Sequence, residues 1–147
     1  MPITTIESQL LKLGHNPVFF TREIGELNRV LSPYETIYGF VDGWIEQLKS
    51  EGSSYITNNR VIFLVFDDLN KGIMEDISWA DIVKVSTDIT EALSEFAFIT
   101  PFRSICITNI ESRCSAKSFL STIDQLCPEV SRTHRLNTDL RESKVLN

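Results

Sequence analysis

The sequence is poor in residues that bind metals or form disulfides. It has three cysteines and two histidines in 147 residues. The cysteines, Cys106, Cys114 and Cys127, are odd in number and match neither a C-x-x-C pair nor a disulfide framework, so we expect a reducing, cytoplasmic location. His15 and His134 lie far apart in the chain. We therefore expect no metal site and no other cofactor.

The sequence also lacks long apolar runs and the common catalytic motifs. No run approaches the roughly 18 to 20 apolar residues that span a bilayer, and no charged leader with an apolar block opens the chain. We expect a soluble, unprocessed protein. There is no G-x-S-x-G elbow, no phosphate-binding glycine loop and no H-E-x-x-H motif. We predict that the protein is not an enzyme.

Positive charge is scarce in most of the chain. The whole sequence carries 14 Lys and Arg against 20 Asp and Glu, a net charge of −6. Residues 1–127 hold 10 of these cations and 17 of these anions, a net charge of −7, and residues 128–147 hold the remaining 4 and 3. An acidic body repels phosphate backbones and anionic lipid surfaces. We expect no nucleic-acid binding and consider membrane binding unlikely on this ground.

The clearest local signal is a hairpin. Residues 53–57 and 61–66 are two short extended runs joined at Asn58 and Asn59, and Asn accepts the positive φ that a tight hairpin turn requires. All six residues from Val61 to Phe66 are apolar. A strand with one solvated face would alternate, so we expect this strand to be covered on both sides.

The rest of the chain has the pattern of a small mainly β domain. A capping box and apolar residues at helical spacing predict helices over 4–13 and 22–31, followed by a long series of extended segments without helices between them. An amphipathic helix over 115–126 closes the series, with Ser112 or Ser115 as its N-cap. The predicted strands are 36–44, 53–57, 61–66, 73–78, 82–87, 93–100 and 104–108.

These patterns divide the chain into three parts. Residues 1–32 are an N-terminal helical extension packed on the domain, although their apolar stripe could instead dock a partner. Residues 33–127 form the domain, in which the seven strands fold as an antiparallel meander into a barrel or sandwich. Residues 128–147 are a tail that we expect to be frayed or marginally helical.

Three stretches resemble the bacterial pleckstrin-homology (PH-like) family. They are Leu31-x-Pro33-x-Glu35, the hairpin from Tyr55 to Phe63 with its Thr-Asn-x-Arg turn, and Trp79-x-Asp81-Ile82-x-x-Val85. The resemblance covers about residues 30–127. It implies an α+β, mainly β fold: a PH-like seven-stranded antiparallel roll or barrel, capped by a C-terminal helix and here preceded by an N-terminal helical extension.

The resemblance also implies a binding function. In one alternative, loops between strands bind an anionic headgroup or membrane surface weakly, through Lys49, Arg60 and Lys71. Acidic residues in the same loops disfavour the binding of an anion, because phosphate recognition depends on Lys and Arg donors. Lys49 and Lys71 face Glu46, Glu51, Asp67 and Asp68. Arg60 can also be explained by an ion pair with a carboxylate such as that of Asp81.

The favoured alternative is a protein-binding module. Related folds accept an extended peptide at the edge of the fifth strand beside the closing helix, by adding a strand to the sheet. Self-assembly into a homo-oligomer through strand edges is the close rival. The candidate residues for this edge and groove are Ile82, Val83, Val85, Thr87 and Phe119.

Overall fold

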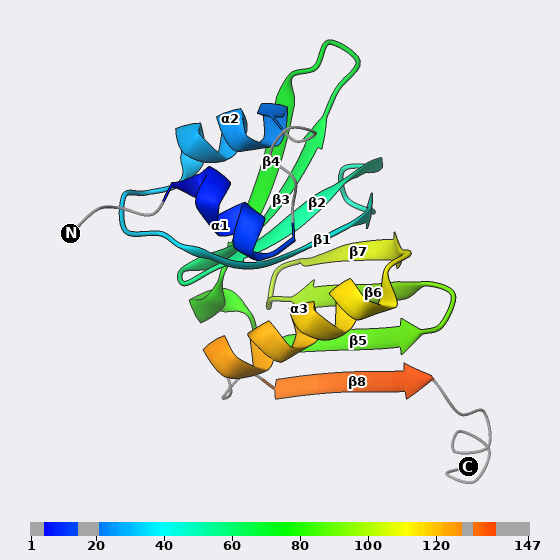
Figure 1. Cartoon of the computed structure of the whole chain (residues 1–147). Coiled ribbons are helices and arrows are strands. Elements are labelled where there is room, and N and C mark those ends of the chain that lie inside the picture. Colours follow the sequence, from blue (N-terminus) through cyan, green and yellow to red (C-terminus); the bar gives the residue numbers. More distant parts are fainter. Residues whose placement is uncertain (1–4, 15–20, 128–130, 138–147) are drawn as a thin grey trace, which may run out of the picture.

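The computed structural model describes residues 5–14, 21–127 and 131–137. Two short helices lead into a single large sheet, and a longer helix follows its seventh strand (Figure 1). The elements are α1 (Ile6–Lys12), α2 (Thr21–Val30), β1 (Ile37–Ile45), β2 (Ser50–Thr57), β3 (Arg60–Phe66), β4 (Gly72–Ser78), the short 3-10 helix η1 (Trp79–Asp81), β5 (Lys84–Thr90), β6 (Ser94–Ile99), β7 (Ser104–Ile110), α3 (Arg113–Leu126) and β8 (Ser131–Asn137).

The sheet has the strand order β4-β3-β2-β1-β7-β6-β5-β8. Every pair among the first seven strands is antiparallel, which confirms the predicted antiparallel meander with a closing helix. The two halves join where β1 pairs with β7 at only two positions, Trp44 with Thr108 and Ile45 with Ile107. The chain crosses from one half to the other through η1, between β4 and β5.

The tail differs from the prediction. Residues 131–137, which we expected to be frayed or marginally helical, form β8 and pair in parallel with the whole of β5. The segment reads Ser-Arg-Thr-His-Arg-Leu-Asn and lacks the apolar alternation that marks a strand in a sequence. Its conformation depends on the neighbouring strand, which no local pattern reveals. The tail residues 128–130 and 138–147 lie outside the described residues.

The main core lies between the sheet and α3, which runs across β5 and β6 in Figure 1. The helix buries Ala116, Phe119 and Ile123, as its amphipathic pattern predicted. Ser112 is the N-cap, and its Oγ accepts a hydrogen bond of 3.1 Å from the Ser115 backbone N–H. Phe119 contacts Phe96 edge to face, with ring centroids 4.9 Å apart. This helix therefore fixes the inner face of the β5 half of the sheet.

A second core lies on the opposite face of the first strands. Ile6, Leu10, Ile24 and Leu27 of α1 and α2 cluster there with Ile37, Tyr55, Ile62 and Leu64. In β3, Val61, Phe63 and Val65 belong to the main core while the alternate residues face the two N-terminal helices. Residues 61–65 are all buried, which confirms the prediction that this strand is covered on both sides.

Candidate functional site

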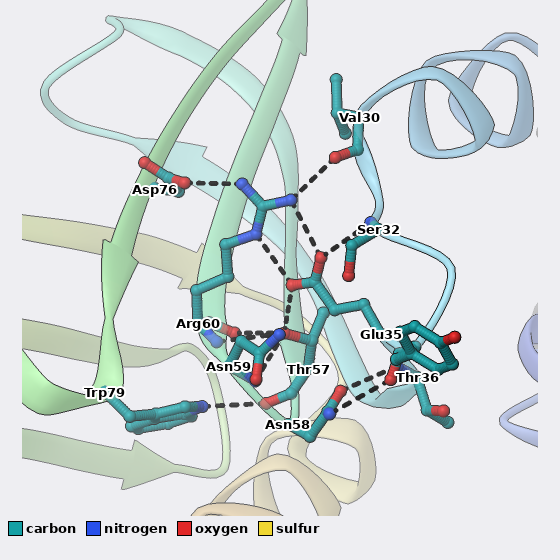
Figure 2. Close-up of polar contacts among 11 residues, drawn as sticks. Val30, Ser32, Glu35, Thr36, Thr57, Asn58, Asn59, Arg60, Asp76 and Trp79 are labelled. Atoms are coloured by element: carbon teal, nitrogen blue, oxygen red, sulfur yellow. Dashed lines mark hydrogen bonds and ion pairs between the residues drawn. The ribbon is translucent and has the colours of Figure 1, made fainter.

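The first candidate site surrounds Arg60 at the start of β3, where the sequence suggested an anion contact. The guanidinium donates from Nε to Glu35 Oε2 at 2.8 Å and from Nη2 to Glu35 Oε1 at 3.0 Å (Figure 2). It also donates from Nη1 to Asp76 Oδ2 at 2.7 Å and from Nη2 to the Val30 carbonyl at 2.8 Å. An arginine has five N–H donors. Four hydrogen bonds within the protein leave little capacity for a ligand.

The Asn58–Asn59 turn is held by the neighbouring side chains. Thr57 Oγ1 accepts hydrogen bonds from the backbone N–H groups of Asn59 (3.1 Å) and Arg60 (3.0 Å), and donates to Glu35 Oε2 at 2.7 Å. Asn58 instead reaches the entry to β1, where its Oδ1 accepts from the Thr36 N–H at 2.8 Å. The motif residues around Glu35 and the hairpin thus form one hydrogen-bonded unit.

The partner predicted for Arg60 was wrong. The prediction named Asp81, but Asp81 lies in η1, beyond the end of β4. Arg60 is the register partner of Ser78, and Asp76 precedes Ser78 by two residues on the same face of β4. Glu35, the second partner, comes from the segment before β1. Sequence reasoning missed it because the contact joins residues 25 positions apart.

The electrostatics of the Arg60 pair indicate a structural role. Burial alone would raise the pKa of Glu35, but hydrogen bonds from Arg60, Thr57 and the Ser32 backbone outweigh it and hold this pKa below its ordinary value. The hydrogen bond with Glu35 raises the pKa of Arg60, against the opposing effect of burial. Both groups are therefore charged at neutral pH, and each neutralises the other.

The three predicted cations do not form one site. Lys49 lies in the turn between β1 and β2 with a φ of 51°. Lys71 lies in the turn after β3, where its backbone N–H donates to Asp67 Oδ1 at 2.8 Å. Arg60 begins β3 at its other end, and a strand of 7 residues separates Arg60 from Lys71, a span of roughly 20 Å.

A cavity of about 810 Å³ beside this cluster does not supply cations either. Its two arginines are Arg60 and Arg103. Arg103 forms an ion pair with Glu75 and donates to the Asp76 carbonyl oxygen at 2.7 Å. Since both guanidinium groups already have carboxylate partners, the cavity offers an anion no free positive charge.

The second candidate site is the outer edge of β5. The structure brings Val85, Thr87 and Phe119 to the buried inner face, while Ile82 is buried and Val83 is 51% exposed in the segment before β5. The prediction that this edge is open was wrong, because β8 pairs with β5 from Lys84 with Ser131 to Thr90 with Asn137. The edge is filled by a segment of the chain itself.

A cluster of acidic residues that sequence reasoning missed lies at the outer face of β5. Glu46, Asp88 and Glu95 line a small cavity of about 150 Å³ together with Cys106. Asp88 in β5 stands directly opposite Glu95 in β6. Burial, followed by the charges of Glu95 and Glu46, raises the pKa of the Cys106 thiol. The alternation of residues 84–90 and 94–99 places both acids on the outer face, but their pairing depends on the hairpin register.

Neither a metal centre nor a membrane-spanning helix is found in the part of the chain that the structure describes. Among residues 5–14 and 21–127, whose side chains the structure describes, no three His, Cys, Asp or Glu side chains are grouped in a way that could hold a metal ion. In the same ranges no helix combines the length and the apolar character needed to cross a bilayer.

Comparison with known proteins identifies the fold. A family model described as the bacterial PH domain matches residues 31–125. No curated protein matches the sequence. Among solved structures, the PH domain from Shewanella amazonensis is similar, with a TM-score of 0.52, 13% identity, and coverage of 73% of this chain and 96% of that one. The hSac2 domain from the human phosphoinositide phosphatase Sac2 has a TM-score of 0.53, 7% identity, and coverage of 83% and 88%. At these identities the structures share the fold alone.

Proposed function

Because the chain belongs to the bacterial PH domain family, we propose that it is a non-catalytic, cytoplasmic protein-binding module that recognises an extended segment at the outer edge of β5. The observation that carries this proposal is the pairing of β5 with β8. All seven residues of β5 have register partners in residues 131–137, a segment outside the seven-stranded antiparallel sheet. An edge that accepts one extended segment has the geometry to accept another.

The side chains on the inner face of this edge belong to or adjoin the main core. Val85 and Phe119 are fully or almost fully buried on the inner face, and Thr87 lies between Val85 and Ile89 in the alternating pattern of β5. Backbone pairing provides affinity that is independent of sequence, and alternate side chains provide the choice of partner. The same edge could take a strand from a second copy of the chain, which would give a homo-oligomer.

The alternative of anionic headgroup binding has less support. Its best cation, Arg60, is bound to Glu35 and Asp76, and a strand separates it from Lys71. Phosphate recognition uses several converging Lys or Arg donors. We therefore assign Arg60 to the stability of the fold.

The test is a peptide-binding assay on the full chain. A variant with Thr133→Pro and His134→Pro removes two successive backbone N–H groups from β8, so at least one position that donates to β5 is lost. We expect a fluorescent peptide with the sequence of residues 130–138 to bind this variant with at least tenfold higher affinity than the wild-type chain, whose edge is occupied.

The matched control is the same peptide with the two prolines in it, which should not bind. Circular dichroism establishes that the variant is folded, and light scattering reports any change in oligomeric state. A folded variant that fails to bind the peptide would show that the β5 edge does not accept extended segments.

A further inference from the structure

We propose that the β5 edge selects basic extended segments, through the carboxylates of Asp88 and Glu95 on the outer face of β5 and β6. This inference rests on the proposed function and adds the chemistry of the partner to it. Residues 131–137 are then an internal ligand, and a protein partner displaces them with a segment of the same charge pattern.

The acidic pair is unfavourable in isolation. Asp88 and Glu95 are direct register partners across β5 and β6, and like charges directly opposite each other destabilise a sheet. Asp88 Oδ1 is buried and has no hydrogen-bond partner among the side chains of residues 5–14 and 21–127, and in these two ranges no cation forms an ion pair with Asp88, Glu95 or the neighbouring Glu46. A buried carboxylate oxygen without a partner carries a desolvation penalty. A cation brought by a strand at this edge would remove both penalties.

The inner side of the same strand has a second unsatisfied group. Thr87 is 4% exposed, and its Oγ1 has no hydrogen-bond partner among the side chains that the structure describes. Buried hydroxyls are nearly always hydrogen-bonded in folded proteins. Each face of β5 thus carries a polar atom without a hydrogen-bond partner among the described side chains, Asp88 Oδ1 on the outer face and Thr87 Oγ1 on the inner face.

The segment that occupies the edge has the complementary charge. Residues 131–137 contain Arg132 and Arg135 and no acidic residue, whereas residues 81–99 contain four acids against Lys84 alone. Arg135 is the register partner of Asp88. Residues at matching register positions in neighbouring strands share a face of the sheet. The chain therefore pairs its basic tail segment with the acidic strand at the position of the unsatisfied carboxylate.

In this arrangement residues 131–137 compete with a protein partner for the β5 edge. A tethered segment acts at a high effective concentration, commonly in the millimolar range for short linkers. A partner must therefore match the charge pattern of the tail to displace it. Because the contact between charges at a sheet edge is partly exposed, binding should weaken as salt shortens the Debye length from about 10 Å at 0.1 M to about 3 Å at 1 M.

The test uses the Thr133→Pro, His134→Pro chain and the peptide of residues 130–138. The Arg135→Gln change in the peptide should weaken binding about tenfold. Replacing Arg132, whose register partner is the apolar Val85, should weaken it less than threefold and controls for the loss of one charge. Introducing Asp88→Asn and Glu95→Gln into the folded chain should weaken binding of the native peptide about tenfold and abolish the difference between the native and the Arg135→Gln peptides.

The matched control for the chain is Asp68→Asn with Glu7→Gln, which removes two exposed acids far from β5 in the sequence and should leave binding within a factor of two. Equal binding of the native and the Arg135→Gln peptides would overturn the charge selection and leave the proposed function standing. Absence of binding by every peptide would overturn both. These outcomes separate the failure of the inference from the failure of the proposed function.

A second measurement does not need the Thr133→Pro, His134→Pro chain. In the full chain with an intact β8, we expect amide hydrogen exchange at residues 131–137 to be about tenfold faster in the Asp88→Asn, Glu95→Gln variant than in the wild type. Arg135→Gln should have the same effect and should add little to the double variant, because all three changes remove one interaction. Unchanged exchange in both variants would contradict the inference.

Discussion

Arg60 and Glu35 form a two-point ion pair, with Nε to Oε2 at 2.8 Å and Nη2 to Oε1 at 3.0 Å. The pair joins the start of β3 to the segment that precedes β1. Its carboxylate is almost entirely buried, with 2% of the Glu35 side chain exposed. In this protein Arg60, the cation of the hairpin motif, is therefore part of the structure that joins β3 to the segment before β1.

Replacing Arg60 tests this structural role. Arg60→Ala leaves the Glu35 carboxylate buried without its cation, so we expect the free energy of unfolding to fall by about 3 kcal/mol, as measured by urea denaturation. The matched control is Arg29→Ala, because Arg29 forms an exposed ion pair with Glu26 and exposed pairs contribute little to stability. Equal effects of the two variants would contradict the structural role of Arg60.

The Glu35 carboxylate should make stability depend on pH. Its pKa is lowered in the folded state, so it contributes stability above the unfolded pKa of about 4.3, and this contribution is lost as the pH falls through the lower folded pKa. Urea denaturation of the wild type and Glu35→Gln should show the largest difference at pH 7 and a smaller one at pH 3. A difference that stays constant with pH would mean that Glu35 is not the titrating group.

The hydroxyl of Thr57 should matter more than its methyl group. Thr57→Val leaves two turn N–H groups and one Glu35 oxygen without this partner, and we expect a loss of about 2 kcal/mol in the free energy of unfolding. Thr57→Ser keeps the hydroxyl and should lose less than about 1 kcal/mol. A serine variant as unstable as the valine variant would show that packing, and not the hydrogen bonds, fixes the turn.

The N-terminal helices should unfold together with the domain. Leu27 is fully buried in the second core, so Leu27→Ala should lower the free energy of unfolding by about 3 kcal/mol in a single cooperative transition. Leu11→Ala is the control, because Leu11 is 59% exposed, and it should change stability by less than about 0.5 kcal/mol. Two separate transitions would show that residues 5–30 form an independent appendage.

The sequence predicted best where one local signal was sufficient. The position of the Asn58–Asn59 hairpin, the doubly buried strand of β3 and the amphipathic helix with its Ser112 cap are each encoded within a few residues. The positive φ predicted for the asparagine turn was wrong, because among the described non-glycine residues only Lys49, Asn70 and Asn109 have a positive φ. The partners of Arg60 were not predictable in this way, because Glu35 and Asp76 reach it from other segments.

The candidate site was only partly predictable for the same reason. The sequence indicated the β5 edge and placed Val85, Thr87 and Phe119 beside it, and the structure buries all three. It did not reveal β8, whose residues adopt a strand only by pairing with β5. Nor did it reveal the opposition of Asp88 and Glu95, because the register of β5 and β6 depends on how the hairpin closes.

The most direct test of recognition at the β5 edge is a footprint of the bound peptide. Hydrogen exchange with mass spectrometry on the Thr133→Pro, His134→Pro chain should show that the peptide of residues 130–138 protects amides of Lys84–Thr90. The other edge strand among the described residues, Gly72–Ser78, should exchange at an unchanged rate. Protection of Gly72–Ser78, or saturating peptide without protection of Lys84–Thr90, would contradict the account.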